Sequence, residues 1–245
     1  MSIPASATVA PERVRMLAGE AELVCVWRNE LGGLTFRATS PGAQARFIKW
    51  GPRNAETSMR DEAERMRWAR RWTTVPRVID QGEDAVHEWL VTAAIEADSA
   101  VAPQWVARPE VAVPAIGRAL RRLHDALPAD SCPWSWNVRD RLENAARRGI
   151  VVPEHLRDAP PIDVAVVCHG DACCPNTLIA ADGTGIAHVD LAALGVADRW
   201  ADIAVASMST EWNYGPGWED TLIDAYGVAP DRERLAYYRD LWNAT

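Results

Sequence analysis

Lysine is almost absent from this sequence. Among the 26 basic residues of a chain of 245, Lys49 is the single lysine and all the others are arginines. The basic residues are outnumbered by 34 acidic ones, which gives a net charge of −8. This balance argues against a nucleic-acid partner, because phosphates require a basic surface. It is compatible with a small cationic substrate.

Cysteine pairs and long apolar runs are also missing. No two of the five cysteines have C-x-x-C spacing, and two are adjacent, which argues against a zinc site or a disulfide framework. The five are Cys25, Cys132, Cys168, Cys173 and Cys174. We expect free thiols in a reducing compartment, with one of the adjacent pair open to thiol reagents. No signal peptide and no apolar run of membrane-spanning length is found, so we predict a cytoplasmic protein without a membrane partner.

The rest of the composition is that of an ordinary globular protein, with 48% hydrophobic and 24% charged residues. Strand patterns come first and helical patterns later. The expected strands are residues 23–27, 34–39, 45–50, 75–79 and 86–92, and the expected later helices are residues 109–127, 137–148, 198–206, 218–226 and 230–242. This order predicts an α+β fold of two lobes, an N-terminal antiparallel sheet with one main helix and a mostly helical C-terminal lobe.

The segment from His169 to Asn176 carries the clearest chemical signal. It reads His-Gly-Asp-Ala-Cys-Cys-Pro-Asn between two apolar runs, the second of which ends at Asp190. Kinase catalytic loops have an aspartate and an asparagine at this spacing, followed by another aspartate. We therefore predict that Asp171 accepts the proton of a substrate hydroxyl, and that Asn176 and Asp190 hold Mg²⁺ against the phosphates of ATP. The alternative is a β-turn, which favours Asp and Asn for local reasons.

Lys49 ends an alternating apolar strand. A lysine there can point into a cleft and meet nucleotide phosphates, and a site that needs a compact ammonium would keep lysine where the rest of the chain uses arginine. The alternative is a solvated lysine at the edge of the sheet. Gly32 and Gly33 lie in the turn between the first two strands and fit either a hairpin that covers the nucleotide or a plain turn.

A helix is predicted over residues 56–72, with an apolar stripe on one face. A carboxylate from this helix would hold Lys49, as the lysine–glutamate pair of kinases does. Glu62, thirteen residues after Lys49, is modestly preferred on spacing over Glu56 and Glu64. The alternative for each is a surface pair with an arginine.

The predicted domain boundaries follow from a break in the strand pattern. Residues 93–97 interrupt it and form a candidate hinge, where an adenine would bond the backbone at Ala93 and Ile95. We predict a nucleotide-binding lobe over residues 1–92, the hinge over residues 93–97, and a catalytic and substrate-binding lobe over residues 98–245. ATP would lie between the lobes.

Five blocks of sequence carry a resemblance to a known family. They are residues 29–36, 61–68, 120–124, 169–176 and 194–204, and they occur in the family's order along nearly the whole chain. In these blocks the chain resembles the aminoglycoside phosphotransferases, especially the 3'-phosphotransferases, which have a protein-kinase-like fold. The resemblance implies that Asp171 is the catalytic base and that Lys49, paired with Glu62, holds the ATP phosphates. It also implies that Asp202, together with His169, supports the catalytic loop.

Three departures from the family concern the substrate side. The arginine that usually follows the metal-binding aspartate is missing after Asp190, and the acidic-aromatic end of the family's chains is missing too. The segment before His169 is shorter, which leaves Glu154, Asp158 and Asp163 as the acidic residues for an antibiotic. The resemblance implies that a monomer or dimer uses ATP and Mg²⁺ to phosphorylate a hydroxyl of an aminoglycoside. The alternatives are a kinase of another hydroxylated small molecule and a catalytically idle nucleotide- or drug-binding protein.

Overall fold

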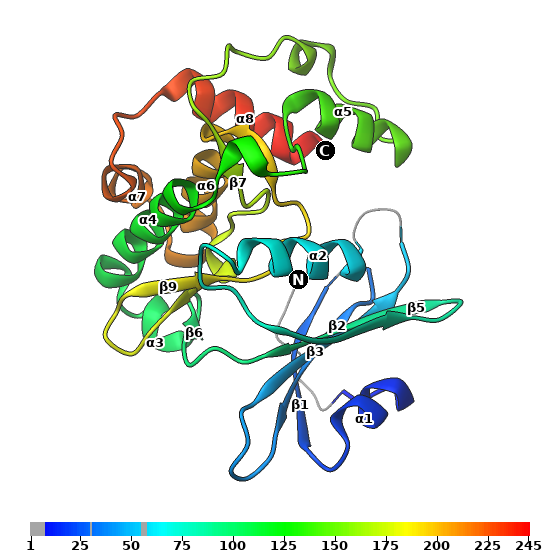
Figure 1. Cartoon of the computed structure of the whole chain (residues 1–245). Helices are drawn as coiled ribbons and strands as arrows, with labels where there is room; N and C mark the ends of the chain where they lie inside the picture. Colours follow the sequence, from blue (N-terminus) through cyan, green and yellow to red (C-terminus); the bar gives the residue numbers. More distant parts are fainter. Residues whose placement is uncertain (1–7, 30, 55–57) are drawn as a thin grey trace. The chain divides into compact units, whose positions relative to one another are not determined.

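The computed structural model describes residues 8–29, 31–54 and 58–245. The chain divides into two units (Figure 1). Unit 1 is built from residues 1–71 and 76–95, and unit 2 from residues 72–75 and 96–245.

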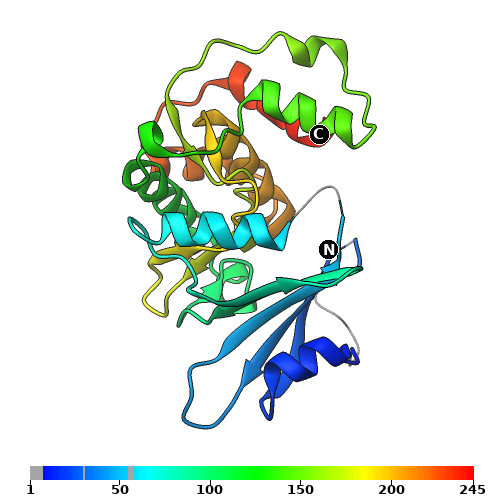
Figure 2. The same ribbon diagram turned by 45° about the vertical axis from the view of Figure 1, so that its right-hand side comes forward.

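Unit 1 is an antiparallel sheet with one helix on each face. Its strands are β1 (Glu22–Arg28), β2 (Leu34–Thr39), β3 (Arg46–Pro52), β4 (Val78–Glu83) and β5 (His87–Ala93), and they lie in the order β1-β2-β3-β5-β4. Helix α1 (Glu12–Ala18) precedes the sheet, and α2 (Met59–Ala69) follows β3. Figures 1 and 2 show α1 and α2 on opposite faces of this sheet.

The alternation of side chains along the strands decides what each face carries. Phe36 of β2 and Ile48 of β3 are cross-strand partners, and both are buried in the core that α1 completes. Lys49 follows Ile48 and therefore lies on the other face, where α2 packs. Leu90 of β5 is the cross-strand partner of Lys49 and is 1% exposed. The sheet thus separates an apolar core on the α1 side from the face that carries the lysine.

Two predicted boundaries in unit 1 are wrong. The strand expected over residues 75–79 begins only at Val78 and extends to Glu83. Pro76 has no N–H to donate to a strand neighbour, and pairing with β5 starts at Val78. The helix expected over residues 56–72 ends at Ala69, and Ser58 caps its beginning by accepting a hydrogen bond from Asp61 N (3.2 Å). Residue 56 lies outside the described residues.

Unit 2 is mostly helical. Its helices are α3 (Pro103–Val106), α4 (Pro109–Ala126), α5 (Val138–Arg147), α6 (Trp200–Tyr214), α7 (Glu219–Tyr226) and α8 (Arg232–Ala244), and its 3-10 turns are η1 (Ala129–Ser131), η2 (Glu154–Arg157) and η3 (Cys174–Asn176). Helix α6 is central, since ten of its 15 residues are buried. It packs against α4, α7 and α8 (Figure 1). A loop anchored to α6 is therefore anchored to the core of unit 2.

Two short sheets carry the loops of unit 2. Strand β7 (Ala165–Cys168) pairs with β10 (Gly195–Asp198), and β8 (Thr177–Ile179) pairs with β6 (Asp98–Ser99) and β9 (Gly185–His188). The helix expected to begin at Asp198 begins at Trp200, because Asp198 still pairs with β7. The predicted α+β architecture is confirmed. Every helix in the part of the chain that the structure describes is too short or too polar to span a lipid bilayer.

Candidate active site

Lys49 and Glu62 form an ion pair in unit 1. Lys49 Nζ lies 2.7 Å from Glu62 Oε1. Glu62 lies on the inner side of α2 and is 3% exposed, whereas Glu64 is exposed and pairs with Arg60. Of the two described candidates, Glu62 is therefore the one that contacts Lys49. A carboxylate that is almost fully buried needs a partner of opposite charge, so the pair fixes the direction of the lysine side chain.

The predicted glycine pair forms the tight turn between β1 and β2. Gly32 has a φ of +84°, a conformation that favours glycine. Gly33 N donates a hydrogen bond to Asn29 Oδ1 (2.6 Å), and a Cβ on Gly33 would lie 2.6 Å from Asn29 Nδ2. The turn therefore needs glycine at Gly32 for its own geometry, whereas a side chain at Gly33 would displace the Asn29 amide. Their predicted role in covering a nucleotide stays a prediction.

The predicted adenine-binding backbone lies at the end of unit 1. Ala93 ends β5, and Ile95 is the last residue of the unit. Between them, Ala94 donates its N–H to Ala45 O (2.8 Å) and accepts a hydrogen bond from Gln44 Nε2 (3.0 Å). Ile95 N–H makes no backbone hydrogen bond with any residue that the structure describes. A donor is thus left for a ligand at Ile95.

In unit 2, the loop after β7 places Asp171 beside Asn176. Asn176 Nδ2 donates to the backbone oxygen of Asp171 (2.9 Å) and to its Oδ2 (3.1 Å). Asp171 Oδ1 is buried and accepts no hydrogen bond from the described residues. A buried carboxylate oxygen without a donor is costly unless a ligand supplies one. This oxygen is therefore suited to receive the proton of a bound hydroxyl.

The surroundings of Asp171 also change its acidity. Burial raises the pKa of the Asp171 carboxyl above its ordinary value of 3.8, and the charge of Asp190 adds to the rise. The nearby Cys173 thiol, the His169 ring and the Asn176 amide act in the opposite direction. A raised pKa brings a carboxylate closer to the range in which a general base is effective at neutral pH.

Asp202 fixes the backbone of the same loop from the first turn of α6. It is 1% exposed; its Oδ2 accepts a hydrogen bond from His169 N (2.6 Å) and its Oδ1 one from Gly170 N (2.9 Å). His124 Nε2 of α4 lies 2.9 Å from Asp202 Oδ2, and His124 Nδ1 lies 2.8 Å from the Tyr226 hydroxyl of α7. Burial alone would raise the pKa of Asp202, but the hydrogen bond and charge of His124 hold it below its ordinary value. The ionised carboxylate thus joins the loop to three helices.

Asp190 is brought to the loop through the backbone. Val189 N donates to Asn176 O (3.0 Å), just beyond the paired residues of β8 and β9. His169 Nε2 lies 2.8 Å from Val189 O, and His169 Nδ1 accepts a hydrogen bond from Asp171 N (3.2 Å). Asp190 itself is exposed, with a φ of +64°, and no other non-glycine residue that the structure describes has a positive φ. Strained backbone at an exposed carboxylate is typical of functional sites.

Asn176 and Asp190 form a donor set that fits Mg²⁺. The Asn176 amide nitrogen is directed to Asp171, so its amide oxygen is turned away from that carboxylate. An amide oxygen and a carboxylate are hard ligands of the kind that Mg²⁺ prefers. The donor chemistry of the loop therefore fits the predicted metal.

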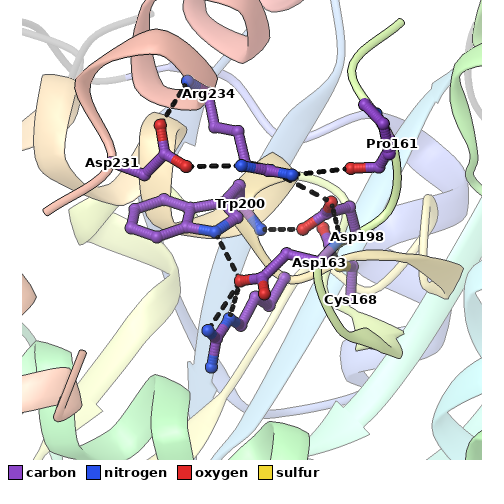
Figure 3. Close-up of polar contacts among 8 residues, drawn as sticks. Pro161, Asp163, Cys168, Asp198, Trp200, Asp231 and Arg234 are labelled. Carbon is purple, nitrogen blue, oxygen red and sulfur yellow. Dashed lines mark hydrogen bonds and ion pairs between the residues drawn. The ribbon is translucent and has the colours of Figure 1, made fainter. Parts of the chain in front are cut away.

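The three acidic residues predicted on the substrate side have different surroundings. Glu154 begins η2 and Asp158 follows it; both are exposed, and neither has an ion pair with another described residue. Asp163 belongs instead to a cluster of paired charges (Figure 3). Its Oδ2 lies 2.6 Å from Arg199 Nη2 and accepts a hydrogen bond from Trp200 Nε1 (2.8 Å). Of these three residues, Glu154 and Asp158 thus carry negative charge that no ion pair with another described residue neutralises.

Asp163 precedes β7 in the sequence and Asp171 follows it. The cluster around Asp163 therefore lies at the opposite end of this strand from Asp171. In this cluster the buried Asp198 accepts hydrogen bonds from Asp163 N and Trp200 N, and lies 4.0 Å from Arg234 Nε (Figure 3). A groove of about 710 Å³ opens beside it, and none of its lining residues belongs to the segment 169–176. The contacts of Asp163 stabilise the fold, and its predicted role in substrate binding stays a prediction.

The expected exposure of Cys173 or Cys174 is wrong. Cys173 is 5% exposed and Cys174 is fully buried. Burial raises the pKa of Cys173 far above its ordinary value and that of Cys174 to about 12. The thiolate is the reactive form of cysteine. These two thiols are therefore protected from reagents by their burial and by their raised pKa values.

Thiol labelling of the native protein at pH 8 is therefore expected to modify Cys25 and Cys132 first, since both are half-buried and the other three cysteines are buried. All five should react in denaturant. The measurement is a chromogenic disulfide reagent followed by peptide mass spectrometry. Rapid labelling of Cys173 in native protein would contradict the burial described here.

Two residues beside the predicted site residues were not predicted from the sequence. Phe47 lies two residues before Lys49 on β3, and thus on the same face of the sheet, where an aromatic ring could stack on a base. The period of two along the strand was the signal for it. Tyr226 contacts His124 across 102 positions of sequence. No local pattern could have indicated that contact.

These features define a kinase-like phosphotransferase. The chain belongs to the phosphotransferase enzyme family, whose sequence pattern matches residues 31–238. The family match covers both units.

Several characterised proteins are similar to the chain along most of its length. An aminoglycoside 3'-phosphotransferase of Streptomyces fradiae is 32% identical, covering 81% of this chain and 84% of that protein. A crystal structure of aminoglycoside-3'-phosphotransferase of type VIII has a TM-score of 0.78 at 29% identity, covering 95% of this chain and 97% of that one. Aminoglycoside phosphotransferase APH(3'')-Id of Streptomyces rimosus, in complex with ADP and streptomycin, has a TM-score of 0.68 at 26% identity, covering 93% and 94%. The predicted family and protein-kinase-like fold are confirmed.

Proposed function

We propose that this protein transfers the γ-phosphate of ATP to a hydroxyl group of an aminoglycoside. The observation that carries the proposal is the loop of unit 2, where a buried Asp171 oxygen without a donor lies beside Asn176. Asp190 follows the residue that bonds Asn176 O. Phosphoryl transfer needs an oxygen that accepts a hydroxyl proton and separate oxygens that bind a metal.

Each polar group of the loop has one role in this proposal. Asp171 Oδ1 orients the acceptor hydroxyl and takes its proton as the new P–O bond forms, while the bond from the γ-phosphorus to the β–γ bridging oxygen breaks and ADP leaves. Asn176 holds Asp171 through its amide nitrogen, and together with Asp190 it would hold Mg²⁺. The metal, when bound, supplies positive charge to the phosphate oxygens. Asp202 and His169 keep the loop backbone in place.

The nucleotide is assigned to unit 1. Lys49 would contact its phosphates, with Glu62 fixing the lysine side chain. Phe47 lies on the same face and would stack on the adenine, and Ile95 N–H would donate to the ring. We infer that residues 93–97 form the hinge between the two lobes and that Gly32 and Gly33 shape a turn over the phosphates.

The acceptor is proposed from charge and from the relatives. Aminoglycosides are polycations, and a protein with a net charge of −8 attracts them. Glu154 and Asp158 offer exposed carboxylates without ion pairs within the described chain. One relative named above is described as acting at a 3' position and another is seen with streptomycin. We propose the 3'-hydroxyl as the site of transfer, because the relative described as acting at a 3' position is the more similar of the two, at 32% identity against 26%.

The test is ADP release by the purified protein with ATP and Mg²⁺. The acceptors are aminoglycosides with a 3'-hydroxyl, their 3'-deoxy counterparts as matched controls, and streptomycin. We expect turnover with the first group, little with the second, and loss of turnover when EDTA removes Mg²⁺. Turnover with streptomycin alone would reassign the hydroxyl. Binding of ATP without turnover on any hydroxylated amine would favour the idle nucleotide-binding protein instead.

A further inference from the structure

We propose that Glu88 is a positioning residue for the Lys49–Glu62 pair. Its carboxylate holds the N-terminus of α2 at the place along the sheet where Glu62 meets Lys49. The inference rests on the proposed function, in which this pair holds the ATP phosphates.

The contact joins a strand to the beginning of a helix. Glu88, on β5, is 6% exposed, and its Oε2 accepts a hydrogen bond from Met59 N (2.9 Å). Met59 is the first residue of α2, and the first N–H groups of a helix have no acceptor within the helix. Ser58 Oγ supplies an acceptor for Asp61 N, and Glu88 supplies one for Met59 N. A full negative charge also complements the positive end of the helix dipole.

The strand register places Glu88 on the same face as Lys49. Leu90 is the cross-strand partner of Lys49, and Glu88 lies two residues earlier on β5. The partner of Glu88 on β3 is Gly51, where a Cβ would lie 2.9 Å from Gly33 Cα and 3.8 Å from Met59 Cε. The missing side chain at Gly51 therefore leaves room for the backbone of Gly33, while Met59 at the start of α2 lies at ordinary contact distance.

Among the polar contacts of the described residues, two that join α2 to the sheet lie less than one helical turn apart. At one, Met59 N donates to Glu88; at the other, Glu62 pairs with Lys49. A helix held at one point can still rotate about its axis and slide along it, whereas two points fix both. If the first contact is lost, Glu62 is free to shift and Lys49 loses its fixed direction.

Packing alone does not explain a carboxylate at this position. Burial raises the pKa of Glu88, which means that its charged form is costly there. Among the described residues it has no ion-pair partner, and Glu83, opposite on β4, carries a like charge. A neutral glutamine would cost less desolvation, but it accepts a hydrogen bond about half as strong as a carboxylate does and brings no charge to the helix end. What the glutamate adds is its charge against the helix end.

The test compares Glu88→Gln with Glu22→Gln, which removes the same charge from an exposed position on β1. We expect Glu88→Gln to raise the KM for ATP about threefold to tenfold, leaving the KM for the acceptor within about twofold. The midpoint of thermal unfolding should stay the same or rise, since a buried charge is removed. Amide exchange at the start of α2 should become faster. Glu22→Gln should match the wild type in all four measurements.

A double-mutant cycle separates positioning from direct contact. In a Glu62→Gln background, the added Glu88→Gln change should have no further effect on the KM for ATP, because Glu88 acts through Glu62. The inference would be overturned if the two substitutions raised the KM for ATP independently, so that the double variant showed the product of the two single effects. It would also be overturned if Glu88→Gln left both the KM for ATP and the amide exchange rate unchanged. Lys49→Met separates the role of the Lys49–Glu62 pair from the role of Glu88. If it leaves the KM for ATP unchanged, the proposed role of the pair fails; if it raises the KM while Glu88→Gln does not, only the positioning role of Glu88 fails.

Discussion

Asp171→Asn is expected to lower kcat by about a hundredfold to ten-thousandfold, the usual contribution of a general base. The substitution keeps the size of the side chain and its hydrogen bond with Asn176, but an amide cannot take the proton of the acceptor hydroxyl. The nucleotide is assigned to other residues, so the dissociation constant for ATP should stay within about twofold. The measurements are steady-state ADP release and calorimetric binding of ATP.

The control for this change is Asp182→Asn, which removes the same charge from an exposed turn of unit 2. It should leave kcat unchanged. If Asp171→Asn kept more than about a tenth of the wild-type kcat, Asp171 would not be the base. If ATP binding and kcat fell together with the unfolding midpoint, the loop would have a mainly structural role.

Asp202→Asn is expected to have the largest effect on stability. The buried Asp202 carboxylate now accepts hydrogen bonds from two backbone N–H groups of the loop and contacts a histidine. In the variant, the amide NH2 group takes the place of one carboxylate oxygen, so a donor of the side chain faces a donor that has lost its acceptor. Removing one partner from such a buried charged network costs about 3–5 kcal/mol of unfolding free energy. The loop of Asp171 should loosen as well, with a large loss of kcat. Chemical denaturation at neutral pH measures the first effect.

A milder variant tests the same network if Asp202→Asn fails to fold. Tyr226→Phe removes only the hydroxyl 2.8 Å from His124 Nδ1 and should cost about 1 kcal/mol. Asp240→Asn, an exposed position on α8, is the charge-matched control and should lie within about 0.5 kcal/mol of the wild type. Equal stabilities for all these variants would show that the network does not anchor the loop.

The acid limb of the stability curve gives an independent check of Asp202. Its folded pKa lies below the ordinary value of 3.8, so the folded state favours the ionised form. The stabilisation is therefore complete above the unfolded pKa and is lost as the pH falls through the folded one. The difference in unfolding free energy between wild type and Asp202→Asn should shrink as the pH falls below about 4. A difference that grows there would mean that the pKa is raised instead.

The sequence predicted what local chemistry decides. The order of strands and helices followed from periodicity, and the loop of Asp171 and Asn176 followed from a short motif with fixed spacing. From the sequence, Glu62 and Glu64 could be compared only by their spacing from Lys49. In the structure Glu62 is buried and pairs with Lys49, whereas Glu64 is exposed and pairs with Arg60. Helical geometry allows both, and the packing of α2 on the sheet decides between them.

What escaped prediction depends on contacts distant in sequence. The helix start expected at Asp198 is wrong, because Asp198 ends β10 and the pairing of β10 with β7 depends on residues distant in sequence. The exposure expected for Cys173 failed for the same reason, since α6 packs beneath the loop and buries it. The contacts of Asp163 with Arg199 and Trp200 could not be predicted either, since both partners lie more than 35 positions later in the sequence.

The solitary ammonium of Lys49 has a practical consequence for anyone who handles this protein. Amine-directed dyes, crosslinkers and coupling resins find one lysine side chain in the sequence, and it is one quarter exposed beside a buried carboxylate. Conjugation there would sever the link between sheet and helix. Tethering chemistry should therefore be directed at carboxylates or at an introduced cysteine on the surface.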